Sequence, residues 1–353
     1  MRVLITGGAG FVGSSLALKL KDRYPQYTIL CMDNLKRRGS ELNVSALKKN
    51  NIVFLHGDIR NIEDFEQVGN IDLLLECSAE ASVLAGYDTS PSYLLNTNLM
   101  GTINCLEHVR KHDAKFIFLS SSRVYPIEYI NNMAFKESDT RFELIDQAGI
   151  SFGSSQGVNE NFPLDKPRTL YGATKLASEL IIQEYAYMYG VNALINRCGV
   201  LTGPGQFGKS DQGVVVLWIA KHFWKKPLKY IGYGGEGKQV RDILHVDDLF
   251  ELIDYQINNI DDLAGETFNV GGGEDISISL LELTALCEKY TGNKIQIDSE
   301  IDDRQGDIRV YLTDNTKVTQ HTGWQPKKTP DDIVRETYQW IVENEFKLKE
   351  ILE

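Results

Sequence analysis

The chain has 353 residues, five cysteines and a formal net charge of -12, with the mix of apolar and charged side chains that is typical of a globular protein. This length is ample for a large core, and we expect one larger and one smaller domain. The acidic balance argues against a nucleic-acid partner, which needs a broad basic surface. No charged leader precedes an apolar stretch, and no apolar run approaches the roughly 20 residues that span a bilayer, so we expect a cytoplasmic protein without a membrane partner.

The first predicted element is a short β-branched strand that runs into a glycine-rich loop and then into an amphipathic helix. In the GxxGxxG spacing, Gly7 would permit the tight turn, Gly10 would let backbone amides approach a pyrophosphate, and Gly13 would let the helix pack on the strand. The N-terminus of the helix, with Phe11 and Val12, would then face the anion. Glycines alone could mark a structural turn, but the flanking strand and helix favour a dinucleotide site.

Apolar strand-like runs alternate with helical patterns along the first half of the chain, which predicts an α/β fold with a doubly wound parallel sheet of the Rossmann type. The predicted strands comprise residues 3–6, 29–32, 52–55, 73–77, 116–120 and 193–197. We expect the NAD-binding domain to occupy residues 1–198 and 242–270, taking back a strand-like segment near residues 243–248. A smaller, interleaved substrate domain would occupy residues 199–241 and 271–353.

Polar residues after the second and third predicted strands are placed to bind the adenosine half of a dinucleotide. Asp33 ends the second strand, where a carboxylate hydrogen-bonds the ribose and disfavours a 2'-phosphate, so NAD is favoured over NADP. Asn34 and Arg38 follow, within a basic run that could instead receive a phosphate. Asp58 and Ile59 suit contacts around the adenine, although a strand-end turn would also explain Asp58.

Tyr171 and Lys175 lie four residues apart in a helical pattern, so they share one face of the helix and can act as a single proton-transfer device. An unperturbed tyrosine has a pKa near 10 and is a poor base at neutral pH unless a cation such as Lys175 stabilises the phenolate. Ser121 ends the fifth predicted strand, where ligands of doubly wound sheets bind, and can hydrogen-bond a reacting hydroxyl. A YxxxK sequence is common by chance, but together with Ser121 and the glycine loop it predicts alcohol oxidation.

The cysteine and histidine pattern argues against a metal site. The cysteines are scattered without CxxC spacing, which fits reduced thiols better than a disulfide framework or a zinc site. His108 and His112 have the spacing of a ligand pair, but the adjacent Arg110 and Lys111 indicate the basic, solvated end of a helix. We therefore expect no bound metal.

Residues 126–166 form a long polar stretch with neither helical nor strand periodicity, which predicts a functional loop or, alternatively, a surface excursion without a role. Tyr230 and Tyr233 could stack on a base, or could pack a loop of the smaller domain. Arg304 and Asp307 could form a plain ion pair.

The chain resembles the extended short-chain dehydrogenase/reductase family that acts on nucleotide sugars. The segments that carry the resemblance follow in the family's order over almost the whole chain: TGGAGFVGS, FLSSSRVY, YGATK, NRCGVLTGP, QVRDILHVDDL, NVGGG and RQGDIR. The resemblance implies NAD as the cofactor and a catalytic triad of Ser121, Tyr171 and Lys175. It also implies that the smaller domain binds the sugar nucleotide and that the protein is a homo-oligomer.

The same resemblance implies further site residues. The cofactor site would include Asn98, Ser120, Tyr171 and Lys175. The substrate site would comprise Ser122, Arg123, Asn196, Lys209, Arg241 and Arg309. Within this set, Arg241 and Arg309 would bind the diphosphate.

The residues after Ser121 discriminate between the reactions of the family. Sugar 4,6-dehydratases carry an Asp-Glu pair there, whereas this chain has Ser122 and Arg123, so elimination of water lacks its acid and base. Epimerisation needs only Tyr171, Lys175 and NAD. Within the family, segments such as DNLKRRGS and QGVNENFPLDKPRTLYGATK resemble those of epimerases that act on CDP sugars, and this resemblance implies a CDP sugar epimerised at C2. A UDP sugar epimerised at C4 is the alternative. An NAD-binding sensor without turnover is a different class, and it would be expected to lose the tyrosine or the lysine.

Overall fold

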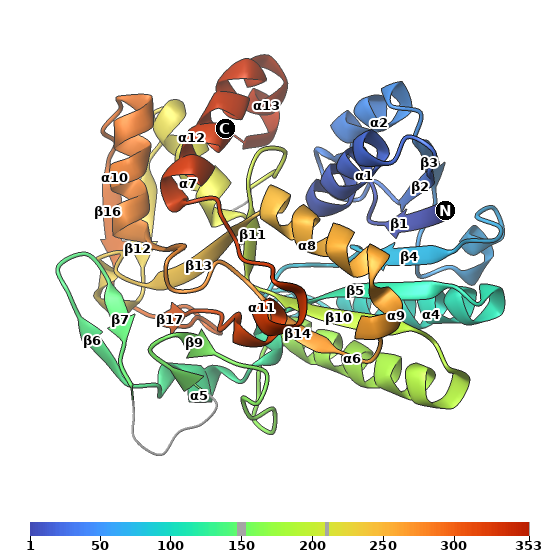
Figure 1. Cartoon of the computed structure of the whole chain (residues 1–353). Helices are drawn as coiled ribbons and strands as arrows, with labels where there is room; N and C mark the ends of the chain where they lie inside the picture. The colour runs from blue at the N-terminus through green and yellow to red at the C-terminus, as the bar shows by residue number, and fades with distance from the viewer. Residues whose placement is uncertain (147–152, 209–211, 353) are drawn as a thin grey trace. The chain divides into compact units, whose positions relative to one another are not determined.

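The structure is a computed structural model that describes residues 1–146, 153–208 and 212–352. The chain forms two compact units, and each of them is built from three segments (Figure 1). Unit 1 comprises Met1–Val124, Thr169–Arg197 and Phe250–Phe268. Unit 2 comprises Tyr125–Arg168, Cys198–Leu249 and Asn269–Glu353.

Unit 1 is built on a seven-stranded sheet in the order β14-β10-β5-β4-β1-β2-β3. The strands are β1 (Arg2–Thr6), β2 (Thr28–Asp33), β3 (Val53–His56), β4 (Leu73–Glu76), β5 (Lys115–Ser121), β10 (Ala193–Cys198) and β14 (Thr267–Val270). The pairs β2·β3, β1·β2, β1·β4 and β4·β5 are parallel. The strand order reverses between β1 and β4, which is the switch point at which doubly wound sheets bind ligands. The predicted fold class is confirmed.

Helices cover both faces of this sheet (Figure 1). The helices α1 (Phe11–Arg23), α2 (Ser40–Lys49) and α8 (Val246–Asn258) lie on one face, and α4 (Gly101–His112) and α6 (Leu170–Tyr189) lie on the other. Shorter elements are η1 (Ile62–Phe65), α3 (Ser92–Leu95), the π-helical turn η2 (Asn96–Met100), the 3-10 turn η3 (Ser122–Val124) and α9 (Ile260–Leu263). The elements α3, η2 and α4 follow one another without a break, so the π turn interrupts a longer helix.

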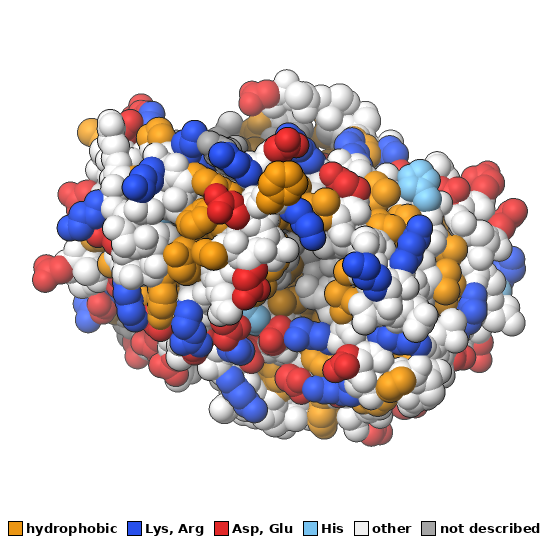
Figure 2. Space-filling view, turned by 90° about the horizontal axis from the view of Figure 1, so that it is seen from above, with side chains coloured by type: hydrophobic (Ala, Val, Ile, Leu, Met, Phe, Trp, Pro, Cys, Tyr) orange, Lys and Arg blue, Asp and Glu red, His pale blue; other side chains and the backbone are white. Residues whose placement is uncertain are grey.

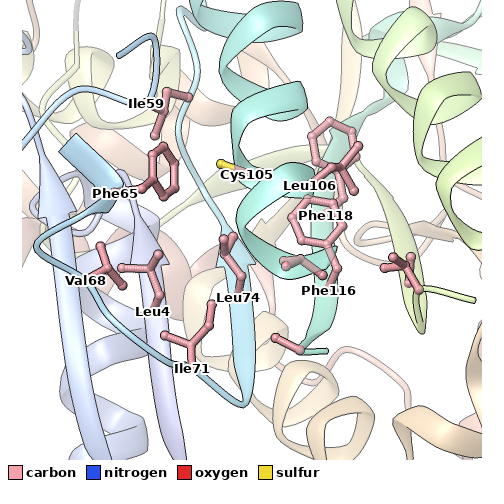
Figure 3. Packing of buried hydrophobic residues seen from close by; sticks show 14 of the residues in the cluster. Leu4, Ile59, Phe65, Val68, Ile71, Leu74, Cys105, Leu106, Phe116 and Phe118 are labelled. Carbon is pink, nitrogen blue, oxygen red and sulfur yellow. The ribbon is translucent and has the colours of Figure 1, made fainter. Parts of the chain in front are cut away.

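Apolar side chains of the sheet and of α4 form the core of unit 1, part of which Figure 3 shows. Leu4, Leu74, Phe116 and Phe118 from three adjacent strands pack with Leu106 from α4, and all five are fully buried. Parallel strands that are covered on both faces need apolar residues on both faces, which explains the continuous apolar runs in the sequence. Each such side chain contributes roughly 1.5–3 kcal/mol through burial.

Unit 2 contains a four-stranded sheet in which β13 pairs with three other strands. The strand β13 (Val240–His245) is parallel to β11 (Val200–Thr202) and β17 (Val310–Tyr311) and antiparallel to β15 (Ser277–Ser279). Two-stranded sheets are formed by β12 (Leu228–Ile231) with β16 (Ile297–Glu300), β6 (Phe135–Glu137) with β7 (Phe142–Leu144), and β8 (Gly153–Ser154) with β9 (Gly157–Val158).

The helices of unit 2 enclose a second apolar core. Its centre is formed by α7 (Val214–Phe223), α10 (Leu280–Thr291) and α12 (Pro330–Glu343), which pack on one another. The remaining elements are α5 (Ile127–Asn131), the 3-10 turn η4 (Tyr233–Gly235), α11 (Thr316–Thr322) and α13 (Glu345–Leu352).

The two units interleave along the chain, but their boundaries differ from the predicted domains by more than two residues at two segments. Residues 242–249 belong to unit 2 because β13 makes its hydrogen bonds with β11, β15 and β17. Residues 125–168 also belong to unit 2, and the predicted long loop contains a helix and two hairpins in its described part. The hairpin β6–β7 is anchored by an ion pair between Arg141 and Glu282 with an N–O distance of 2.6 Å.

Charged and potentially metal-binding side chains are dispersed. Figure 2 shows acidic and basic side chains interspersed over the face in view. The described residues contain no helix that is long and apolar enough to cross a membrane, and no cluster of three or more metal-ligating side chains. His108, which was predicted to be solvated, is buried, with its ring centre 5.3 Å from that of Phe65. Its position facing the core, rather than the adjacent basic residues, decides its environment.

Candidate cofactor and catalytic site

The glycine loop joins β1 to α1 at the switch point of the sheet. Gly7 has φ +63°, and a Cβ atom there would lie 2.8 Å from the carbonyl oxygen of Cys77. A Cβ atom on Gly13 would lie 2.3 Å from the carbonyl oxygen of Gly7, whereas one on Gly10 would lie 3.1 Å from the same oxygen. The predicted turn and close helix packing are therefore present. The first turn of α1, which includes Phe11 and Val12, has amides without intrahelical acceptors, as an anion requires.

Asp33 ends β2 and connects it to the glycine loop. Its Oδ2 accepts a hydrogen bond from the Ala9 amide at 3.0 Å, and its Oδ1 accepts one from the Leu35 amide at 2.8 Å. Burial raises the pKa of Asp33, and the backbone hydrogen bonds oppose this shift. The carboxyl group thus lies at the loop, where a ribose would be bound.

The residues after β3 form a second polar group near the end of the sheet. Asn34 donates to Asp58 at 2.9 Å, and Arg60 forms an ion pair with Asp58 at 2.6 Å. Burial would raise the pKa of Asp58, but the hydrogen bonds from Arg60 and Asn34 prevail and lower it to about 2. Arg38 is exposed, whereas Ile59 is buried in the core and is not available to an adenine through its side chain.

The predicted catalytic residues lie on β5 and α6. The helix α6 begins after Thr169, whose hydroxyl accepts a hydrogen bond from the Gly172 amide. Tyr171 and Lys175 are both buried, and the Lys175 ammonium donates to the Leu119 carbonyl at 2.9 Å. Ser121 is the last residue of β5, and its hydroxyl accepts from the Arg123 amide at 3.1 Å. Because α6 packs on β5 and η3, the structure brings this helix to the carboxyl end of β5.

Asn98 lies in the π-helical turn η2 and is fully buried. Its side-chain amide accepts from the Glu80 amide at 2.8 Å, and donates to the Glu80 carbonyl at 3.0 Å and to the Thr174 hydroxyl at 3.2 Å. The backbone carbonyl of Asn98 accepts a hydrogen bond from the Ser178 hydroxyl at 2.9 Å. Asn98 therefore connects the loop after β4 to α6, and π turns of this kind are frequent at functional sites.

Ser120, which was predicted to contact the cofactor, hydrogen-bonds Glu179 through its hydroxyl. Glu179 also forms a buried ion pair with Arg197 of β10, with an N–O distance of 2.7 Å. This three-residue group connects α6 to β5 and β10. Its signal in the sequence was weak, because a Glu in a helix and an Arg in a strand are ordinary on their own.

The predicted substrate residues of unit 1 have different environments. Ser122 is buried and Arg123 is half-buried on η3, directly after the predicted catalytic serine. Asn196 is fully buried, and its side-chain amide exchanges two 2.8 Å hydrogen bonds with that of Gln256. The prediction that Asn196 binds substrate is not supported, because this pairing gives it a packing role.

The predicted diphosphate arginines lie in unit 2. Arg241 forms an ion pair with Asp307 at 2.7 Å and donates to the Ile308 carbonyl. Asp307 thus pairs with Arg241 rather than with Arg304. Arg309 lies over the Phe135 ring, 4.1 Å from its centre, and over Tyr233 at 5.2 Å.

Of the other predicted residues of unit 2, Lys209 lies outside the described residues. Tyr230 stacks on Trp218 with ring centres 5.8 Å apart, and its hydroxyl hydrogen-bonds Thr284. Tyr230 is therefore a packing residue, the second of the two alternatives.

The sequence model of the NAD dependent epimerase/dehydratase family matches residues 3–271 of this chain. The chain belongs to this family. It is 32% identical to the CDP-paratose 2-epimerase of Salmonella typhi over 96% of this chain and 99% of that protein. Two solved structures are similar at 25% identity. The first is a UDP-glucose 4-epimerase from Thermotoga maritima with UDP-glucose, which has a TM-score of 0.78 and covers 98% of this chain and 99% of that one. The second is a dTDP-glucose 4,6-dehydratase from Bacillus anthracis with NAD, which has a TM-score of 0.76 and covers 100% of both chains.

The residues of unit 1 fit the NAD of this epimerase/dehydratase family. The tight turn at Gly7 and the close approach of α1 to the loop at Gly13 are possible only because both residues lack a Cβ atom, and a loop of this kind before a helix suits a pyrophosphate. Asp33, at the end of β2, would hold the ribose hydroxyls. The predicted cofactor is thus confirmed at the level of the family, and the individual contacts stay predictions.

One further polar residue of unit 1 was missed by the sequence reasoning. Glu76 is the last residue of β4 and is fully buried. Its Oε1 accepts a hydrogen bond from the Thr102 hydroxyl at 2.7 Å. The signal in the sequence is a single charged residue near the end of the apolar run LLLEC, inside a predicted strand.

Proposed function

We propose that this chain is an NAD-dependent nucleotide-sugar epimerase that converts CDP-paratose to CDP-tyvelose by transient oxidation at C2. The observation that carries the chemistry is the buried Tyr171 and Lys175 on α6, with the lysine ammonium fixed to β5. The substrate is supported by the 32% identity to CDP-paratose 2-epimerase over nearly the full length of both chains. A UDP-sugar 4-epimerase is the second candidate, favoured by the similarity to the UDP-glucose 4-epimerase structure.

In this mechanism the phenolate of Tyr171 accepts the proton of the sugar hydroxyl at C2. The Lys175 ammonium stabilises the phenolate, and the Ser121 hydroxyl hydrogen-bonds the reacting oxygen. NAD, which the glycine loop and Asp33 would hold, would supply the redox chemistry, namely the removal of a hydride from C2 and its return to the opposite face of the sugar. Tyr171 then returns the proton to the oxygen. The reaction has no net redox change, so the cofactor is expected to stay bound through turnover.

The residues beside Ser121 favour epimerisation over dehydration. Dehydration needs an acid and a base to remove a proton and a hydroxide from adjacent carbons. Ser122 and Arg123 occupy the positions directly after Ser121, and neither is a carboxylic acid. The keto sugar would therefore have no route to lose water through these two residues.

Arg241 and Arg309 are proposed to bind the diphosphate of the substrate. Arg241 already binds a carboxylate, Asp307, at 2.7 Å, and a phosphate makes the same type of charge-assisted hydrogen bond. On this proposal the diphosphate takes the place of Asp307 on the guanidinium. The cytoplasmic location and the homo-oligomer stay predictions.

A proton NMR time course of CDP-paratose with purified protein, without added NAD, tests the proposal. Conversion to an equilibrium mixture with CDP-tyvelose is expected, and would also reveal retained cofactor. Unchanged CDP-paratose even after NAD is added would refute the C2 assignment, and conversion of UDP sugars would then support the second candidate. A protein that binds NAD but converts none of these substrates would fit the sensor class.

The matched variant is Tyr171→Phe, which removes only the phenol oxygen. Nucleotide binding is expected to be retained while turnover falls by about 100-fold or more. Turnover comparable to that of the natural chain would exclude Tyr171 as the proton acceptor.

A further inference from the structure

A buried carboxyl group interacts with the lysine of the proposed catalytic pair, and the proposed mechanism gives this carboxyl group no role. Glu76 of β4 is 0% exposed, and Leu74, on the same face of β4, belongs to the apolar cluster of unit 1. Burying an ionisable group without a role is costly, so its presence requires an explanation.

The strand register locates Glu76 next to Lys175. Glu76 pairs with Phe118 of β5 and with Thr6 of β1, and paired residues on adjacent strands project to the same face of a sheet. The Lys175 ammonium lies 4.3 Å from the centre of the Phe118 ring. The carboxyl group of Glu76 therefore lies on the face of the sheet that α6 covers, one strand away from the ring beneath the ammonium.

The groups around Glu76 come from four elements. Lys175 of α6 and Cys105 of α4 are the titratable groups that interact with it, and the Lys175 charge favours its ionised form. The Thr102 hydroxyl donates to it, while β1 and β5 contribute Thr6 and Phe118, which carry no charge. Figure 3 shows Cys105 and Phe118 within the apolar cluster. One turn beyond Lys175, Glu179 is already paired with Arg197.

We propose that Glu76 is a positioning residue that acts through the Lys175 ammonium and thereby controls the exchange of the Tyr171 proton. This inference rests on the proposed function in one respect, the role of Tyr171 as proton acceptor. When Glu76 is ionised, its charge offsets that of Lys175, and the phenolate of Tyr171 loses part of its stabilisation. When Glu76 is neutral, the lysine charge acts on Tyr171 unopposed.

The balance between the two forms lies close to neutral pH. Burial raises the pKa of Glu76 to about 7, although the Lys175 charge and the Thr102 hydrogen bond oppose the shift. Above this pH the ionised carboxyl group offsets part of the Lys175 charge and so disfavours the Tyr171 phenolate. Below this pH Glu76 is neutral, so Glu76→Gln should change the stabilisation of the Tyr171 phenolate little.

The test is the ionisation of Tyr171, measured by phenolate absorbance in the purified holoenzyme. Because the chain has 16 tyrosines, each spectrum is corrected by subtracting that of the same protein with Tyr171→Phe. Glu76→Gln should move the titration of Tyr171 to lower pH by about 0.5 unit or more. The acidic limb of the pH profile of kcat should move in the same direction.

Leu74→Ala is the control for packing, because Leu74 is fully buried two residues earlier in β4 and carries no charge. It should lower stability without moving the titration. Thr102→Val is the second charge-related variant. It removes the donor to Glu76, makes the neutral carboxyl group more abundant, and should move the titration to lower pH by a smaller amount.

An unchanged titration in Glu76→Gln, or an equal shift in Leu74→Ala, would overturn the inference. If Glu76→Gln does not fold, Thr102→Val decides, and no shift in that variant overturns it. A shift in a protein that epimerises no nucleotide sugar would refute the proposed function alone, because the absorbance titration does not depend on turnover.

Discussion

The buried ion pair between Glu179 and Arg197 should contribute far more to stability than an exposed pair in the same unit. Glu179→Gln keeps the size of the side chain but leaves the Arg197 guanidinium with a neutral partner. The side chains of Glu179 and Arg197 are 1% and 7% exposed. The pair is joined by three hydrogen bonds of 2.7, 3.1 and 3.2 Å, and Glu179 also accepts the Ser120 hydroxyl.

The size of the effect follows from the burial of the two groups. Removing one member of a buried pair leaves an uncompensated charge and typically costs about 3 to 5 kcal/mol. Glu251→Gln is the matched control, because it breaks an exposed ion pair with Arg23. The side chain of Arg23 is 37% exposed and that of Glu251 is 55% exposed. An exposed pair contributes less than about 1 kcal/mol. The double variant Glu179→Leu with Arg197→Met should cost less than Glu179→Gln alone, since it leaves no buried charge.

Urea unfolding, followed by far-ultraviolet circular dichroism, measures the free energy of unfolding of each variant. The reasoning about burial would be refuted by equal losses in Glu179→Gln and Glu251→Gln. It would also be refuted if the double variant lost more stability than Glu179→Gln.

Two further predictions concern His108 and the glycine loop. Burial, with a smaller effect of His112, lowers the pKa of His108 from 6.5 to about 4. Between pH 6.5 and 4 only the unfolded chain takes up this proton, so the free energy of unfolding should fall by up to about 3 kcal/mol as the pH drops across this range. Urea titrations of His108→Phe at several pH values should show a weaker dependence of the free energy of unfolding on pH. The same dependence in both proteins would contradict the assignment. In the loop, Gly13→Ala places a Cβ atom 2.3 Å from a backbone oxygen, so this variant should lose NAD binding and about 1 to 3 kcal/mol of stability. Gly10→Ala should lose NAD binding but keep the fold. Calorimetry measures the NAD binding of both variants.

The strands of unit 1 could be predicted closely because their sequence pattern has a local physical cause. The predicted strands at 3–6 and 116–120 correspond to Arg2–Thr6 and Lys115–Ser121. Burial on both faces makes such strands continuously apolar, and the adjacent turns fix their ends. An apolar run does not encode the sheet that it joins, however. The segment near 243–248 was therefore assigned to the wrong unit, because its partners β11, β15 and β17 are distant in the sequence.

The same distinction between local and distant information applies to the site. Tyr171 and Lys175 could be found because their spacing alone places them on one helical face. The pairing of Arg241 with Asp307, 66 residues away, could not be read from the sequence. Nor could the pairing of Asn196 with Gln256, 60 residues away. These partners are selected by the tertiary fold, so the role predicted for Asn196 lacked the contact that decides it.

The helix that carries the proposed catalytic pair is fixed mainly by directional polar contacts. Along one side of α6, Tyr171, Thr174, Lys175, Ser178 and Glu179 follow the spacing at which a helix usually buries apolar residues, and all five are buried. Hydrogen bonds connect the last four of these residues to η2, β5 and β10. An apolar stripe would tolerate small rotations of the helix, whereas each of these bonds is lost when the helix turns or slides. The cost of burying polar groups thus secures the position of the Tyr171 hydroxyl, which proton transfer requires to within a fraction of an ångström.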